Sequence, residues 1–175
     1  MEKPGLMKYL VIYYSKTGNT RKVAGAIYDA LPGEKRIKPM NEIHTPEEND
    51  LMFIGFPIMQ FGPPARASQF ISRHAAGKKI ALFVTHAMPC MSDDPNQEAM
   101  LEKELNRCRA ACSKSQLLGL FHCQGELSED IARELIASGN PLLMEFAGMR
   151  PLTIGHPDPE ELEQARIFAV GTITP

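Results

Sequence analysis

The chain has 175 residues, of which 43% are apolar, so it is about the size of one domain and can bury roughly 70% of its unfolded surface. Its formal net charge is −2, and its basic residues are scattered rather than gathered in dense Lys/Arg blocks, which excludes nucleic acid as an expected partner. The apolar run at residues 9–14 is too short for a signal segment or a membrane span, so we expect a cytoplasmic protein with no membrane attachment.

Strands and helices are predicted to alternate through the first half of the chain. Residues 8–14 predict a first strand, and the helical pattern that follows places four apolar side chains on one face: Val23, Ala24, Ile27 and Leu31. Residues 35–39 predict a poorer strand nearer an edge. Residues 50–56 are apolar after Asp50, which predicts a central strand buried on both faces. Two prolines then open a helix over residues 63–75.

The second half continues this alternation. Residues 78–86 predict a fourth strand, and a helix capped by Asp94 extends to about Cys112. Residues 116–125 predict the fifth strand, and Ser128 caps a helix that ends near Ala137. After a stretch punctuated by proline and glycine, residues 139–157, the pattern predicts a last helix over residues 158–171.

Five strands alternating with helices imply a parallel sheet with right-handed crossovers and helices on both faces. We therefore expect a single α/β domain over residues 1–175, with an extra helical and irregular insertion at about residues 126–157. Ligands of such sheets bind beyond the carboxyl ends of the strands, so the loops after the first, third and fourth strands are the informative ones.

The loop after the first strand has the sequence SKTGNT and opens a helix. Free backbone N–H groups, the helix dipole and the hydroxyls of Ser15, Thr17 and Thr20 can bind a phosphate there, while Gly18 lets the backbone turn. The patterns GxxxxGK[ST] and GxGxxG are absent, which disfavours nucleoside triphosphates and dinucleotides and leaves a terminal phosphomonoester. The alternative interpretation is a capped turn without a ligand.

The SKTGNT loop, together with the 2-1-3-4-5 strand order that the pattern implies, resembles the flavodoxin family, whose S/T-x-T-G-N-T loop wraps the phosphate of FMN. The resemblance covers about residues 7–124 and the last helix, and it implies a three-layer flavodoxin-like fold with FMN as cofactor. The positions that match the phosphate loop are Ser15, Lys16, Thr17, Gly18, Asn19 and Thr20. The candidate ring contacts in the loops after the third and fourth strands are Pro57, Ile58, Met59, Gln60, Phe61, Gly62, Thr85, His86, Ala87, Met88 and Cys90.

The chain departs from the flavodoxin pattern in its aromatic residues. Flavodoxins usually hold the ring between a tryptophan and a tyrosine, but this chain has no tryptophan, and its four tyrosines lie away from the ring loops. We therefore expect stacking by Phe61, by methionines such as Met59 and Met88, or by the backbone. Plain surface packing of Phe61 is the alternative.

Cysteine and histidine spacing gives no indication of a metal site or of a catalytic constellation. Cys108 and Cys112 share an apolar helix stripe and Cys123 lies in a strand, so all three are expected in the core. His86 either caps a loop or approaches the flavin, and His156 is expected at the entry of the last helix.

These observations predict an FMN-binding electron-transfer protein that is either a flavodoxin-like carrier or a partner subunit of a reductase, docking through residues 126–157. The expected partner is a redox protein, either a reductase or an electron acceptor. The alternative is an NAD(P)H-dependent FMN or quinone reductase on the same fold. The sequence leaves open whether the chain is a stand-alone enzyme, and it leaves the oligomeric state open.

Overall fold

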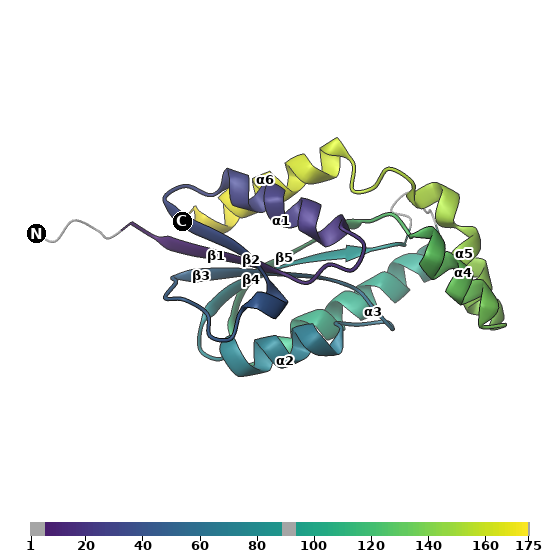
Figure 1. Ribbon diagram of the computed structural model, residues 1–175, viewed down its shortest axis with the longest axis horizontal. Coiled ribbons are helices and arrows are strands. Elements are labelled where there is room, and N and C mark those ends of the chain that lie inside the picture. The colour runs from purple at the N-terminus through teal and green to yellow at the C-terminus, as the bar shows by residue number, and fades with distance from the viewer. Residues whose placement is uncertain (1–5, 89–93, 175) are drawn as a thin grey trace, which may run out of the picture.

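The five strands form one parallel sheet in the order β2-β1-β3-β4-β5, which confirms the predicted topology. The computed structural model describes residues 6–88 and 94–174 (Figure 1). The bounds of the strands are β1 Lys8–Tyr13, β2 Glu34–Pro39, β3 Leu51–Pro57, β4 Lys79–His86 and β5 Gln116–Gln124. All four strand pairs are parallel, so the carboxyl ends of the strands meet at one edge of the sheet.

Helices cover both faces of the sheet and make a three-layer fold (Figure 1). Helices α1 (Asn19–Ala30) and α6 (Pro159–Ile173) lie on one face, and α2 (Ala65–His74) and α3 (Pro95–Ala111) lie on the other. A short 3-10 helix, η1 (Met40–Glu42), follows β2. Helix α2 begins two residues later than the sequence predicts because Pro64 is extended, with ψ of 151°, and acts as the N-cap.

The segment between β5 and α6 lies at the end of the sheet where the strands finish (Figure 1). It contains α4 (Glu129–Ala137), α5 (Pro141–Gly148) and the 3-10 helix η2 (Arg150–Thr153). The sequence predicts no particular helix in the proline- and glycine-punctuated residues 139–157, and α5 forms there because the Asn140 side chain accepts from Leu142 N–H and Pro141 occupies the first helical position. We call residues 126–157 the insert.

The two large parts of the core lie one on each face of the sheet. Residue 55 must be glycine, because a Cβ there would lie 1.8 Å from the ring of Phe83. The predicted burial of three cysteines is confirmed, since Cys108, Cys112 and Cys123 are all buried. Burial raises the pKa of the Cys108 thiol to about 12 and that of Cys112 to about 11, which keeps both thiols protonated and unreactive.

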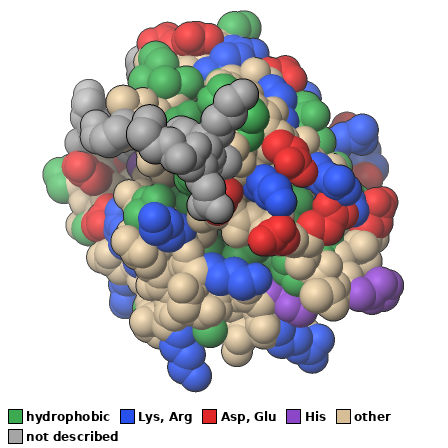
Figure 2. Space-filling view, turned by 90° about the vertical axis from the view of Figure 1, so that its left-hand side faces the viewer, with side chains coloured by type: hydrophobic (Ala, Val, Ile, Leu, Met, Phe, Trp, Pro, Cys, Tyr) green, Lys and Arg blue, Asp and Glu red, His purple; other side chains and the backbone are tan. Residues whose placement is uncertain are grey.

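The end of the molecule where the strands begin lies opposite the insert and carries many charged side chains (Figure 2). Basic and acidic side chains are interspersed on it, and Glu47 binds both Arg36 and Lys38 while Glu48 binds Lys8. Exposed pairs of this kind contribute little to stability, so this end is a solvated surface. No helix within residues 6–88 and 94–174 is both long and apolar enough to cross a membrane.

Candidate functional site

The loop at residues 15–20 turns the chain from β1 into α1. Gly18 occupies the N-cap position of α1 with φ of 99°, a left-handed conformation that a residue with a Cβ adopts only under strain. The Ser15 hydroxyl accepts from the N–H of Gly18 at 3.1 Å and from the N–H of Arg21 at 3.4 Å. Ser15 therefore holds the turn, while Lys16 and Thr17 remain exposed.

The N-terminus of α1 is built to attract negative charge. Its N-cap residue Gly18 has no side chain, so of the described side chains only the Ser15 hydroxyl accepts from a first-turn N–H group, that of Arg21. No acidic residue lies in its first turn, as in α2, whereas the N-cap residues of α3, α4, α5 and α6 each supply a side-chain oxygen. The exposed charges around it are basic: Lys16, Arg21 and Lys22. Cations at the positive end of a helix dipole are unfavourable unless an anion accompanies them. The arrangement therefore favours an anion at this helix end.

Two other side chains of the loop at residues 15–20 bond to other parts of the protein. The Thr20 hydroxyl, which is almost fully buried, lies 2.8 Å from the hydroxyl of Thr85 at the end of β4. The Asn19 amide donates to the carbonyl of Glu126 at 2.9 Å, and a Cβ on Gly125 would lie 2.7 Å from that amide. Thr20 and Asn19 therefore fix the loop against the ends of β4 and β5. Binding of phosphate by the Thr20 hydroxyl stays a prediction.

The loop after β3 contains a strained turn. Met59 and Gly62 exchange backbone hydrogen bonds of 2.9 and 3.2 Å, and between them Gln60 and Phe61 have φ of 49° and 66°. Such left-handed values suit glycine, asparagine or aspartate, and each costs another residue about 1–2 kcal/mol. The Arg107 guanidinium donates to the Phe61 carbonyl at 2.8 Å. Strain of this kind is concentrated at functional sites.

Phe61 presents its side chain at this turn with 52% of its surface exposed. The turn is fixed to the neighbouring strand, because Ile58 N–H donates to the carbonyl of Thr85 at 2.8 Å. The structure therefore brings the predicted ring loop at residues 57–62 beside the end of β4 and leaves an aromatic face open to solvent.

The first residues of the loop after β4 are largely buried. Thr85, His86 and Met88 are buried, and Ala87 packs against the insert. The carbonyl of His86 accepts from Gly125 N–H at 2.7 Å, which joins the ends of β4 and β5. The predicted contact Cys90, with the rest of residues 89–93, lies outside the described residues.

His86 has a partner that the sequence analysis missed. Its Nε2 lies 3.0 Å from Nδ1 of His122 on β5, and its Nδ1 is buried. Burial, followed by the nearby His122, lowers the pKa of His86 to about 3, so the ring is neutral at physiological pH. Burial also lowers the pKa of His122. The pairing depends on the register of β4 and β5, which one sequence does not give.

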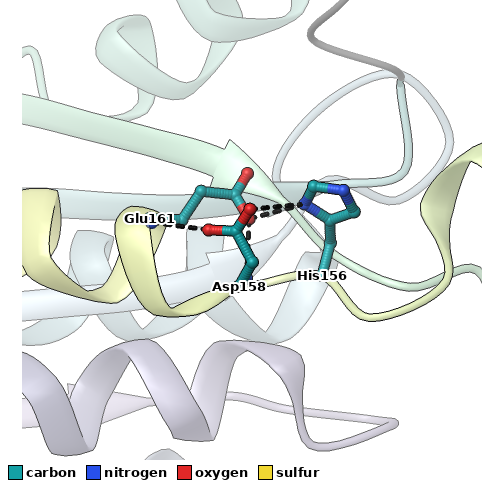
Figure 3. Close-up of side chains that lie close together, drawn as sticks. All are labelled: His156, Asp158 and Glu161. Atoms are coloured by element: carbon teal, nitrogen blue, oxygen red, sulfur yellow. Dashed lines mark hydrogen bonds and ion pairs between the residues drawn. The ribbon is translucent and has the colours of Figure 1, made fainter.

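A second polar cluster lies at the start of α6, where His156, Asp158 and Glu161 come together (Figure 3). The Glu161 carboxylate lies 2.7 Å from Nδ1 of His156 and accepts from the N–H groups of Asp158 and Gln124 at 2.8 and 3.0 Å. Asp158 in turn accepts from Glu161 N–H at 2.8 Å, which completes a capping box. These groups serve the helix entry, where His156 was expected.

Comparisons with known proteins agree with this architecture. The family described as a flavodoxin domain matches residues 10–170. The flavodoxin-like domain-containing protein BilS of Clostridioides difficile (strain CD3) is 31% identical over 173 residues, covering 93% of this chain and 94% of its own.

Two solved structures share the fold at low sequence identity. A flavodoxin from the domain Archaea is 14% identical with a TM-score of 0.54, and the match covers 95% of this chain and 96% of the other. Oxidised Flavodoxin 2 from Bacillus cereus is 18% identical with a TM-score of 0.53, covering 94% and 97%. The sequence matches, together with the strand order and the loop after β1, lead to one conclusion: the chain belongs to the flavodoxin-domain family.

Proposed function

We propose that this protein binds FMN noncovalently in the cytoplasm and transfers electrons to or from a partner protein, as a carrier or as a partner subunit of a reductase. A flavodoxin-like domain suggests an FMN-binding redox protein. The single observation that supports the cofactor best is the N-terminus of α1, which has a left-handed glycine without a side chain at its N-cap, no acidic residue in its first turn and basic residues around it.

The residues at this helix end fit a terminal phosphate. Backbone N–H groups of the first turn lack intrahelical partners, and a Cβ on Gly18 would meet no described atom within 4 Å, so the space beside the turn is open. The Thr17 hydroxyl and the Lys16 ammonium are exposed on the same loop. Hydrogen bonds to a charged group contribute about 1.5–3 kcal/mol each, so a few of them suffice to bind a dianion.

The two neighbouring loops would hold the isoalloxazine ring. Phe61 offers an exposed aromatic face, and the turn at residues 59–62 offers backbone groups held in position by Arg107. The buried His86 is neutral and adds no charge at the end of β4. Bound FMN supplies the chemistry by accepting and releasing one or two electrons. The chain therefore has only to bind the cofactor, orient it and exclude water from it.

A titration of the cofactor-free protein tests this proposal. FMN should bind more tightly than riboflavin, which lacks the phosphate, and more tightly than FAD, whose extra nucleotide needs further room. Thr17→Ala should weaken FMN binding about tenfold or more, because a bond to a dianion contributes about 1.5–3 kcal/mol. The matched control is Thr45→Ala, at an exposed threonine in the segment between β2 and β3.

Riboflavin affinity should be the same for wild-type protein and both threonine variants. Equal affinity of the wild-type protein for riboflavin and FMN would remove the phosphate argument and with it the proposed cofactor site.

A second experiment separates a carrier from a reductase. A reductase must hold the nicotinamide within about 3–3.5 Å of the flavin and must also bind the far end of NAD(P)H. The sequence has no second glycine-rich phosphate loop for that end, and the basic residues after the ring loop at residues 57–62, Arg66 and Arg73, are spaced along α2. We therefore expect the FMN-loaded protein to be reduced by dithionite but not by NADPH. Anaerobic reduction by NADPH at about 10 per second, an ordinary enzyme rate, would assign it as a reductase.

A further inference from the structure

The insert exposes an unusual number of large apolar side chains. Twelve large apolar residues are exposed in the described part of the chain, and five of them fall within residues 136–154. Their exposed fractions range from 43% to 72%. They are Ile136, Leu142, Met144, Leu152 and Ile154, and we call these five the insert surface. Scattered single exposures are ordinary in folded proteins, but a concentration of this kind marks an interaction site.

The inner side of the insert explains why these side chains face outward. Its own core buries only three residues, Leu127, Ala132 and Ala147, two of which are alanines. Helices α4 and α5 pack on each other through this small core, so large side chains elsewhere on them have nothing within the chain to cover them. Residues 142–154 are helical for most of their length, and at about 1.5–2 Å per residue their side chains fall within roughly 25 Å. That span fits one protein contact of standard size.

The insert lies directly beside the candidate cofactor site. Ala87, in the loop after β4, packs against its core. The carbonyl of Glu126, its first residue, accepts from Asn19 in the loop after β1. A molecule bound to the insert surface would therefore contact the protein next to the edge of the sheet where the cofactor is proposed.

The charges of the insert indicate the chemistry of its partner. Residues 126–157 carry five carboxylates and two arginines, a net charge of −3 in a chain whose total is −2. The arginines are paired within the insert, Arg133 with Glu129 and Asp130, and Arg150 with Glu126. Glu134 and Glu145 have no basic partner in the described ranges, and Glu145 lies one helical turn from Leu142.

A net negative charge on the segment that carries the exposed apolar side chains disfavours self-association, because a second copy would bring like charges together. It favours a partner with an apolar contact surface bordered by lysine or arginine. We propose that the insert surface is the docking site for such a basic redox protein. This inference rests on the proposed electron-transfer function and adds to it the place of contact and the charge of the partner.

Electron transfer to mitochondrial cytochrome c, a basic haem protein with an exposed apolar haem edge, tests the inference. The FMN-loaded protein is reduced with dithionite, and the second-order rate constant is measured by stopped flow at low and high salt. Two variants alter the surface: Leu142→Ser with Leu152→Ser, and Glu134→Gln with Glu145→Gln. The matched controls are Ile167→Ser with Val170→Ser and Glu160→Gln with Glu163→Gln, at exposed positions on α6.

We expect each insert variant to lower the rate constant at least threefold, and the charge variant to reduce its salt dependence. The control variants should stay within about 1.5-fold of wild type. Equal rates for insert and control variants would overturn the docking site while leaving the proposed function standing, because wild type would still bind FMN and pass electrons. A wild-type protein that binds FMN but does not reduce cytochrome c would overturn both proposals.

Sedimentation of the same samples tests whether a second copy of the chain binds the insert surface instead. Wild type and both insert variants should sediment as monomers over a wide range of protein concentration. A wild-type dimer that dissociates in the Leu142→Ser, Leu152→Ser variant would assign the insert surface to a second copy of the chain and overturn the inference.

Discussion

Helices α1 and α6 lie side by side on one face of the sheet and begin near the same edge, yet their first turns are built in opposite ways (Figure 1). Helix α6 has a capping box made by Asp158 and Glu161, proline at its first position and acidic residues in its first turn. Helix α1 has at its N-cap Gly18, which has no side chain that could cap the helix, and it has no acidic residue in its first turn.

The start of α6 is stabilised by a capping box and carboxylates of the chain itself, whereas the start of α1 lacks both. The first turn of α6 satisfies its own N–H groups and places carboxylates at the positive end of the dipole, so it needs nothing from outside the chain. The first turn of α1 lacks both features and carries basic residues as well. An external anion would supply at α1 what Asp158 and Glu161 supply at α6.

A carboxylate placed at the start of α1 would make this helix start resemble that of α6, and we expect it to lower FMN affinity more than any other change. Gly18→Asp puts a negative charge where the phosphate is proposed, and two unit charges 4 Å apart repel by about 4 kcal/mol at an effective dielectric constant of 20. We expect FMN affinity to fall on the order of a thousandfold in a fluorescence titration. Gly18→Asn is the control, because it has the same left-handed strain without the charge. Equal losses in the two variants would contradict an anion site.

Removal of the carboxylate at the start of α6 should instead affect stability. Glu161→Ala deletes the acceptor of the Gln124 and Asp158 N–H groups and of His156, and hydrogen bonds to a charged group contribute about 1.5–3 kcal/mol each. We expect the free energy of unfolding in urea to fall by about 3 kcal/mol. FMN affinity of the folded variant should not change. Glu163→Ala, which removes only an exposed pair with Arg166, should cost less than about 0.5 kcal/mol.

Two histidines also differ in their surroundings. His156, before α6, lies against the carboxylate of Glu161, whereas His86, at the end of β4, lies against His122. Because the pKa of His86 is lowered to about 3, its contribution to stability is complete above pH 6.5 and is lost as the pH falls toward 3. The loss is about 1.4 kcal/mol per pH unit in this window. His86→Gln cannot titrate, so its unfolding free energy should fall less steeply between pH 6.5 and 5. Parallel curves for the two proteins would show that His86 titrates alike in both states.

The smallest expected effect concerns the strained turn at residues 59–62. Gln60→Gly and Phe61→Gly each remove one left-handed residue with a Cβ, and each should stabilise the cofactor-free protein by about 1 kcal/mol. Only Phe61→Gly removes the aromatic ring, so only this variant should also weaken FMN binding. Equal FMN affinity of the two variants would place the Phe61 ring outside the site.

Much of the fold could be predicted because its signals are local. The apolar run at residues 51–56 has the character of a strand buried on both faces, and β3 is buried at six of its seven positions. Asp158, Pro159 and Glu161 predict the start of α6, and the structure confirms the capping box. The sequence predicts the start of α2 two residues too early, because proline fits both the last extended residue before a helix and the first helical residue.

The side-chain partners at the edge of the sheet could not be predicted, because each joins segments far apart in the sequence. Thr20 meets Thr85, His86 meets His122, and Arg107 meets the carbonyl of Phe61. These pairs follow from strand register and from the angle at which α3 crosses the sheet, and a single sequence carries neither. The left-handed φ values of Gln60 and Phe61 have no sequence signal either, since neither residue is typical of that conformation.

The hydrogen bond from Asn19 to Glu126 also has a consequence for biosynthesis. Its two residues are 107 positions apart, and a ribosome adding about 5–20 residues per second makes the second roughly 5–20 s after the first. Helix α6, which packs on α1, emerges later still. The loop after β1 therefore leaves the ribosome early, but this bond can form only after Glu126 has been made, so the candidate cofactor site cannot be complete before the fifth strand has been synthesised.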